Sequence, residues 1–328
     1  MMIAGIAASV LALSGAAQEP VKLNRVFAKG EKAQYEVKSG ISSEQRVIGL
    51  ETWMPEDFDI QYVFSYEVTE MKADGICVMR YKRPTITEIE GETVDAPPKK
   101  KVQKVDWDLS LTVSPINELL EVTDLSKKKP DPKKPGGGGS LSRELLPLRA
   151  AKDPSQLGPL VGPFISEVHR LALFVGSLDS CLDFSPKLPL DEVKPGDTWK
   201  RTVGYSPQKM QGKDAKMAVQ RLDYTYTYKG LVDAGGAKVH RITADLALST
   251  DLATFVHQIY DVKPDQTGLK EIPLSLKAAI EFDLDARTHR TIRARASSSG
   301  GFKIVATFRP DQPMVEERFK GETRMRQL

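Results

Sequence analysis

The stretch "LDYTYTYK", residues 222–229, alternates aromatic or apolar side chains with polar ones at every step. Successive side chains of a β-strand point to opposite faces of the sheet, so this period of two predicts a strand with one buried face. Tyr224, Tyr226 and Tyr228 lie on the predicted buried face, and threonine and aspartate occupy the other. Burial on one face only is typical of antiparallel sheets.

Three further segments repeat this alternation: "IQYVFSYEV" at 60–68, "VDWDLSLTV" at 105–113 and "IEFDLDA" at 280–286. The first places Tyr62, Phe64 and Tyr66 on its predicted buried face. The alternation predicts an α+β fold that is mostly antiparallel β, with one or two helices packed on the sheet.

The alternating segments occur in the same order twice along the chain. Each series begins with a Gly-acid turn, at Gly30 and at Gly196, and continues with an aromatic strand, a second glycine turn and another alternating strand. This order predicts two related curved-sheet halves, residues 22–125 and 188–328. The alternative is two unrelated runs of antiparallel hairpins, because turns followed by alternation are common in β proteins.

The sequence between the two halves has a different composition. Residues 126–140, "SKKKPDPKKPGGGGS", combine repelling lysines, prolines and four glycines, so we expect a disordered linker. A helical connector is expected over 141–187, because "ISEVHRLALFVGSL" at 165–178 has apolar residues at helical spacing. Pro163 and Gly176 are its predicted boundaries.

Two more elements are predicted in the second half. "STDLATFVHQIY", residues 249–260, has the apolar spacing of a short helix, and Ser249 or Thr250 could cap it. "RTIRARASSSGGFKIVATF", residues 290–308, has the composition of two strands joined by a Ser/Gly turn.

The first residues indicate an exported protein. An apolar run followed by small residues at Gly15 and Ala17 is typical of a signal peptide over residues 1–17, although no Lys or Arg precedes the run. We therefore expect a periplasmic or extracellular protein of the cell envelope. No later segment is apolar enough for a transmembrane span, and a net charge of +3 gives no support to nucleic-acid binding.

The chain has two cysteines, Cys77 and Cys181. Export permits a disulfide between them, which would close a long loop and stabilise the fold by about 4–5 kcal/mol on the chain-entropy model. The alternative is two buried free thiols, which behave as small apolar residues.

No motif for catalysis, a metal or a cofactor stands out. No two of the four histidines have the spacing of a helical metal pair, and nucleophile elbows, phosphate loops and dinucleotide fingerprints are absent from the sequence. Two acidic pairs, Asp106/Asp108 and Asp283/Asp285, could bind Ca²⁺ or act as acid and base in a hydrolase. The solvent face of an alternating strand explains them fully and is the interpretation we favour, and His240 has the pattern of a core histidine. We therefore expect a non-enzymatic protein without a cofactor.

The aromatic side chains of the predicted inner face are the candidate ligand-binding residues. Tyrosine hydroxyls need partners when buried, so a concave and partly wet surface for an apolar or amphipathic, lipid-like ligand would favour them. The alternative is ordinary core packing. The residues are Tyr62, Phe64, Tyr66, Tyr224, Tyr226 and Tyr228.

Two lysine-rich runs are candidates for contact with an anionic envelope surface. They are residues 99–104, "KKKVQK", and the linker with Lys127, Lys128 and Lys129. The alternative, which we favour, is a solvated loop that keeps the protein soluble. Such contacts suit a second hypothesis, a structural or interaction module of the envelope that has no small ligand.

The segment "VKPGDTW", residues 193–199, resembles a family of uncharacterised exported bacterial β-rich proteins, classed as a domain of unknown function. The motif residues are Pro189, Val193, Gly196, Asp197 and Trp199, with an earlier turn at Lys29, Gly30, Glu31 and Tyr35. The resemblance runs loosely over residues 22–328 and implies an exported, β-rich envelope protein. It implies no catalytic residue and no ligand. A more distant similarity to curved-sheet lipoprotein carriers concerns the fold alone.

Overall fold

The structure of the chain is a computed structural model that describes residues 19–90, 99–125, 158–175, 186–205, 220–260 and 268–328. The predicted signal peptide at 1–17 and the predicted linker at 126–140 lie outside the described residues.

Strands make up most of the described chain. Those of the N-terminal part are β1 (Lys32–Val47), β2 (Met54–Met71), β3 (Cys77–Glu90), β4 (Lys99–Val113) and β5 (Leu119–Asp124). Those of the C-terminal part are β6 (Thr198–Tyr205), β7 (Gln220–Asp233), β8 (Lys238–Asp251), β9 (Leu269–Glu271), β10 (Pro273–Asp285), β11 (Thr291–Ala306) and β12 (Val315–Gln327). The helices are α2 (Gly158–Ala172), α4 (Ala253–Tyr260) and a 3-10 turn, η1 (Ala73–Gly75).

All described strands belong to one open antiparallel sheet of twelve strands, in the order β5-β4-β3-β2-β1-β12-β11-β10-β8-β7-β6 with β9 beside β11. The first and last strands join its two parts, from Tyr35 opposite Gln327 to Val47 opposite Val315. The prediction of a mostly antiparallel β fold with two helices is therefore confirmed. The sheet is continuous across the β1–β12 pair, so two related halves stay a prediction.

The turns that open the two parts make matching contacts. Gly30 N donates to Val68 O at 2.8 Å, and Gly196 N donates to Tyr228 O at 2.8 Å. In each case the acidic residue after the glycine accepts a bond from the same partner's N–H. Both glycines have positive φ, 80° and 96°, which side chains with a Cβ rarely adopt. The "PGD" motif is therefore a structural turn.

The predicted alternation is reproduced in the burial of the strands. Leu222, Tyr224, Tyr226 and Tyr228 are all buried, and their polar neighbours face outward. The pattern of β10 ends one residue earlier than predicted, because Ala286 is exposed in the turn that follows Asp285.

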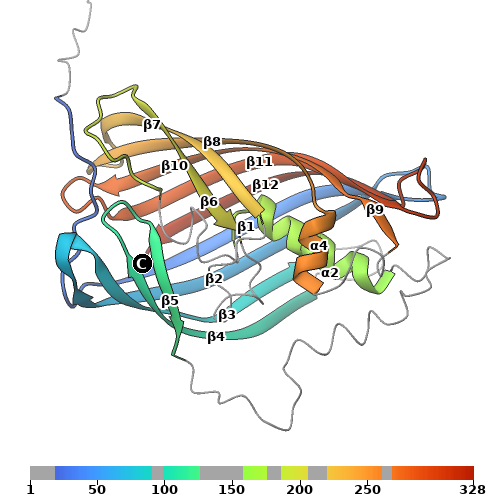
Figure 1. The fold of residues 1–328 in the computed structure, drawn as a ribbon, viewed down its shortest axis with the longest axis horizontal. Helices are drawn as coiled ribbons and strands as arrows, with labels where there is room; N and C mark the ends of the chain where they lie inside the picture. The colour runs from blue at the N-terminus through green and yellow to red at the C-terminus, as the bar shows by residue number, and fades with distance from the viewer. Residues whose placement is uncertain (1–18, 91–98, 126–157, 176–185, 206–219, 261–267) are drawn as a thin grey trace, which may run out of the picture.

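The sheet curves strongly, so that β2–β5 and β6–β8 lie on opposite sides of an interior that holds α2 and α4 (Figure 1). Residues 19–31 cross one end of this trough (Figure 1). We call β2–β5 and β6–β8 the two arms of the sheet. Val21 pairs with Val193, just before β6, and Arg25 N donates to Pro115 O, just after β4, at 2.7 Å. The N-terminal segment thus ties the two arms together.

The prediction of two strands and a turn over 290–308 is wrong, because β11 is one uninterrupted strand. Its glycines let the backbones of the neighbouring strands approach closely. They do not form a turn that reverses the chain. A Cβ on Gly300 would lie 2.1 Å from Ser275 O, and one on Gly301 would lie 2.4 Å from Glu317 O. Glycine inside a strand commonly marks such close approach.

The helix α2 begins at Gly158, so the prediction that it starts after Pro163 is wrong. Pro163 lies within the first two turns, where the missing N–H costs one hydrogen bond but does not end the helix. The chain leaves the helix at Phe174, whose φ is 56°. The predicted boundary Gly176 lies outside the described residues.

The helix α4 was predicted from its apolar spacing, but its predicted caps are wrong. Ser249 and Thr250 still belong to β8. Asp251 takes the capping role, since its Oδ1 accepts bonds from Ala253 N at 3.0 Å and from Ile272 N at 2.7 Å.

Candidate functional site

The six predicted aromatic residues lie on the inner face of the sheet in two separate groups. Five of them are buried, and Tyr66 is half-buried. The group on β2 and the group on β7 are separated in the sheet by β1, β12, β11, β10 and β8. The structure therefore confirms that they point inward but does not bring them into one cluster.

The β2 group belongs to a stack of rings. Phe64 lies between Tyr35 and Tyr81, with ring centroids 5.0 and 5.4 Å away. The guanidinium of the buried Arg83 lies 4.4 Å from the ring centroid of Tyr62 and donates from Nε to Tyr81 Oη at 2.9 Å. Stacked rings and a buried cation–π contact are features of a well-packed interior.

The β7 group is packed in the same manner. Tyr226 stacks on Trp199 at 5.5 Å, and Tyr224 meets Phe174 edge-on at 6.2 Å. Tyr228 Oη lies 2.7 Å from Nδ1 of His240. Burial raises the pKa of Tyr228 to about 12, so its phenol stays protonated. Burial, then the neighbouring His289, lowers the pKa of His240, which fits its predicted role as a core histidine.

A small cavity of about 30 Å3 lies at the end of the sheet that residues 19–31 cross. Phe64 and Tyr66 contribute to its wall. Its polar lining includes Arg25 and Tyr66, and both bond to Glu31: Tyr66 Oη donates to Glu31 Oε1 at 3.0 Å, and Arg25 Nη2 pairs with the same oxygen. Burial raises the pKa of Tyr66. A cavity of this size holds a water molecule or two, not a lipid chain.

A strip of small side chains crosses the inner face where α2 packs. We call it the small-residue groove; its members are Ser39, Ala296, Ser298, Gly321 and Thr323. A Cβ on Gly321 would lie 2.8 Å from Cδ2 of Leu173, and Thr323 Oγ1 donates to Leu173 O at 3.1 Å. The small residues thus let the end of α2 lie directly on the sheet.

Polar contacts hold α2 over the groove. His169 Nε2 lies 2.5 Å from Glu317 Oε1, with both side chains buried. Arg170 donates to Glu167 at 2.6 Å and pairs with Glu88 on β3. Buried ion pairs add little net stability, because desolvation offsets much of their attraction. Since Phe164, Val168 and Leu171 of α2 are also buried, apolar packing and these polar contacts together hold the helix on the sheet.

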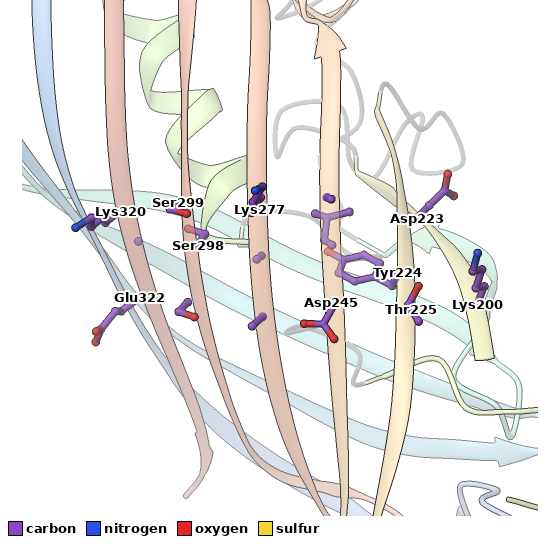
Figure 2. Close-up of a pocket in the computed structure, with 16 residues that line it drawn as sticks. Lys200, Asp223, Tyr224, Thr225, Asp245, Lys277, Ser298, Ser299, Lys320 and Glu322 are labelled. Carbon is purple, nitrogen blue, oxygen red and sulfur yellow. The ribbon is translucent and has the colours of Figure 1, made fainter. Parts of the chain in front are cut away.

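The opposite face of the sheet carries an open hollow of about 850 Å3 across β6, β7, β8, β10, β11 and β12 (Figure 2). Lys320, Ser299 and Lys277 lie side by side on one cross-strand row. Glu322 and Asp245 lie on the next row, about 7 Å along the strands. Positive and negative side chains at this spacing, with small residues between them, suit a small zwitterionic ligand. They do not suit an apolar ligand.

Members of both acidic pairs are engaged in contacts within the fold. Asp108 makes a two-bond ion pair with Arg80, at 2.7 and 2.6 Å, and the backbone of Asp106 has a φ of 48°. Asp285 Oδ1 accepts from Thr288 N and Oγ1, both at 2.7 Å, and closes a turn. No group of three or more His, Cys, Asp or Glu that could hold a metal occurs in the part of the chain that the structure describes.

The interpretation of Asp283 as part of a solvent face is wrong, because its side chain is only 1% exposed. It pairs with Arg241 Nε at 2.8 Å and with Arg293. Burial opposes its ionisation, but the hydrogen bonds from the two arginines outweigh this effect and lower its pKa below the ordinary value.

We expect Asp283→Asn to lower the free energy of unfolding at pH 7 by about 2 kcal/mol, through loss of charged hydrogen bonds to arginines that reach solvent. Since the folded pKa of Asp283 is depressed, its contribution is complete above the unfolded value of about 3.9 and disappears as the pH falls through the folded pKa. Urea unfolding at pH 7 and pH 3 measures this difference, with the exposed Asp245→Asn on the neighbouring strand as control. An equal loss at both pH values contradicts the assignment.

Cys77 is buried, and burial raises the pKa of its thiol to about 12. Its proposed partner Cys181 lies outside the described residues, so the disulfide stays a prediction. Lys127, Lys128 and Lys129 also lie outside them. Within the described ranges, no helix is long and apolar enough to cross a membrane.

The chain was compared with known proteins. No family model and no curated protein matches it. Among solved structures it is similar to lipovitellin, described in a study of lipid–protein interactions, with a TM-score of 0.42 and 7% identity over 92% of this chain. The chain spans 25% of the lipovitellin chain.

Two bacterial structures are similar at lower scores. One is a putative outer membrane lipoprotein-sorting protein domain from Vibrio parahaemolyticus, with a TM-score of 0.14, 8% identity, and coverage of 87% of this chain and 83% of that one. The other is a DUF1329 family protein from Desulfovibrio piger, with a TM-score of 0.15, 9% identity, and coverage of 88% and 84%.

Proposed function

We propose that the chain is an exported envelope protein that binds an amphipathic, lipid-like ligand on the inner face of its sheet, in the small-residue groove that α2 occupies. Export is supported by the leader-like sequence of residues 1–17. The observation that carries the ligand site is the seating of α2 in that groove through buried polar contacts.

The groove has the properties that an acyl chain requires. Its floor is made of small side chains, three of them with hydroxyl groups, and large apolar side chains lie around it on the inner face, including Phe58 on β2 and Phe302 on β11. Phe164 of α2 packs on Phe302 edge-on, with ring centroids 5.9 Å apart. When α2 moves away, an acyl chain could replace these contacts without opening the sheet.

The tyrosines complement this site without forming it. They form the inner walls of both arms, and burial keeps Tyr66 and Tyr228 protonated and able to donate hydrogen bonds. A polar group at one end of a ligand would have to replace Glu31 or His240 as the partner of these hydroxyls, while its chain occupies the groove.

We expect His169→Gln to increase the affinity for a fluorescent phosphatidylglycerol about tenfold. The variant weakens the contact with Glu317, so α2 leaves the groove more readily, and apparent affinity rises with the fraction of binding-competent protein. Fluorescence titration measures the affinity, and Ser166→Ala, on the same helix, is the control.

Weaker or unchanged binding by a folded His169→Gln protein would show that α2 and the ligand do not compete. If neither the wild type nor the variant binds the lipid, the alternative is favoured, a structural or interaction module of the envelope without a small ligand.

A further inference from the structure

We infer that the exposed edge of β4, residues Lys99–Lys104, is a docking surface for an anionic lipid bilayer. In Figure 1 β4 runs along the lower border of the sheet. The inference does not require the groove to hold a ligand, so the two can fail separately.

The segment forms a true edge of the sheet. Residues of β5 pair with β4 only from Leu109 to Val113, and Leu125 N bonds to Asp108 O. Before Asp108, β4 has β3 on one side and, within the described residues, no strand on the other. The backbone and side chains of this edge are thus presented to a partner.

The edge is strongly basic. Lys99, Lys100, Lys101 and Lys104 are exposed, and no acidic residue occurs between them. None of the four forms an ion pair with a described residue. Asp108, further along the same strand, pairs with Arg80 instead. A net charge of +3 on the whole chain is smaller than the charge of this one segment. Unpaired lysines at this density are complementary to anionic headgroups.

The edge also carries exposed apolar side chains, which favour a bilayer over a soluble polyanion as its partner. Val102 lies among the lysines with 57% of its surface exposed, and Leu125 beyond them on the same edge is 41% exposed. A membrane surface offers an apolar phase for such side chains below its headgroups, and a polyanion does not. Lysines on an edge strand also discourage strand pairing between molecules, but that role does not call for an exposed valine between them.

The test is sedimentation of the full chain with vesicles of phosphatidylcholine containing phosphatidylglycerol, at low and high salt. We expect the variant with Lys99, Lys100, Lys101 and Lys104 all changed to Gln to bind about six-hundredfold more weakly, since each lysine near such a surface is worth about a fivefold change. A charge-matched variant keeps wild-type binding, with four exposed lysines changed elsewhere: Lys29, Lys72, Lys229 and Lys238.

Two further measurements distinguish a bilayer from a soluble polyanion as the partner. Val102→Asn is expected to weaken vesicle binding about threefold and to leave binding to dextran sulfate unchanged. The inference is overturned if the edge variant still binds vesicles, if deletion of 126–140 alone abolishes binding, or if Val102→Asn leaves vesicle binding unchanged. The last result, together with tight binding to dextran sulfate, would indicate a polyanion.

Discussion

Replacement of Tyr226 by alanine is expected to lower the free energy of unfolding by about 4 kcal/mol. The ring is fully buried and stacks on Trp199 with the planes 12° apart, and Tyr224 lies 5.8 Å away on the same strand. Loss of a buried aromatic side chain removes both its transfer free energy and its packing contacts. Urea unfolding followed by tryptophan fluorescence measures the change.

The control is Thr227→Ala, one residue along β7, where the side chain is half-buried on the opposite face. It should change stability by less than about 1 kcal/mol. A Tyr226→Ala protein that keeps wild-type stability but loses lipid binding would make this residue part of a ligand wall and contradict its assignment to the core.

Gly300→Ala is expected to cost about 3 kcal/mol, the upper end for overpacking. The added carbon would lie 2.1 Å from Ser275 O and 3.1 Å from Cα of Leu276. Both are main-chain atoms of β10. The clash can therefore be removed only if β10 and β11 move apart, which weakens the hydrogen bonds between them. Thermal or urea unfolding of the purified variant measures the loss.

Ser299→Ala is the matched control, because Ser299 is exposed on the opposite face of the same strand. It should change the free energy of unfolding by less than about 0.5 kcal/mol. Equal stability of the two variants would contradict the account of β11 as a strand that needs glycine for close packing.

The strands could be predicted from the sequence, because alternation is a local property that a buried face imposes directly. The segments around Tyr62, Leu109, Tyr224 and Ile280 all lie on strands with the expected face inward. Their arrangement depends on pairings between residues far apart in the chain, above all β1 with β12, and no local pattern carries that information.

The misassigned elements have specific physical causes. The run from Ser297 to Gly301 has turn composition, but the same small residues also allow two backbones to approach closely. The regular apolar alternation on both sides of it could have indicated a continuous strand. Asp283 was placed on the wet face because its two arginine partners, on β8 and β11, are distant in sequence.

The candidate site was predictable only in part. The aromatic residues were correctly expected to point inward, and their role in ligand binding stays a prediction. The small-residue groove was missed, because it combines Ser39, Ser298 and Gly321 from three strands with a helix from another part of the chain.

The most direct test of the proposed function is amide hydrogen exchange of α2, over Phe164–Ala172, in the free protein and in the protein loaded with phosphatidylglycerol. If the ligand takes the groove, these amides exchange faster in the loaded protein, while those of β10 and β11 keep their protection. Lipid binding that leaves α2 as protected as in the free protein would contradict the account.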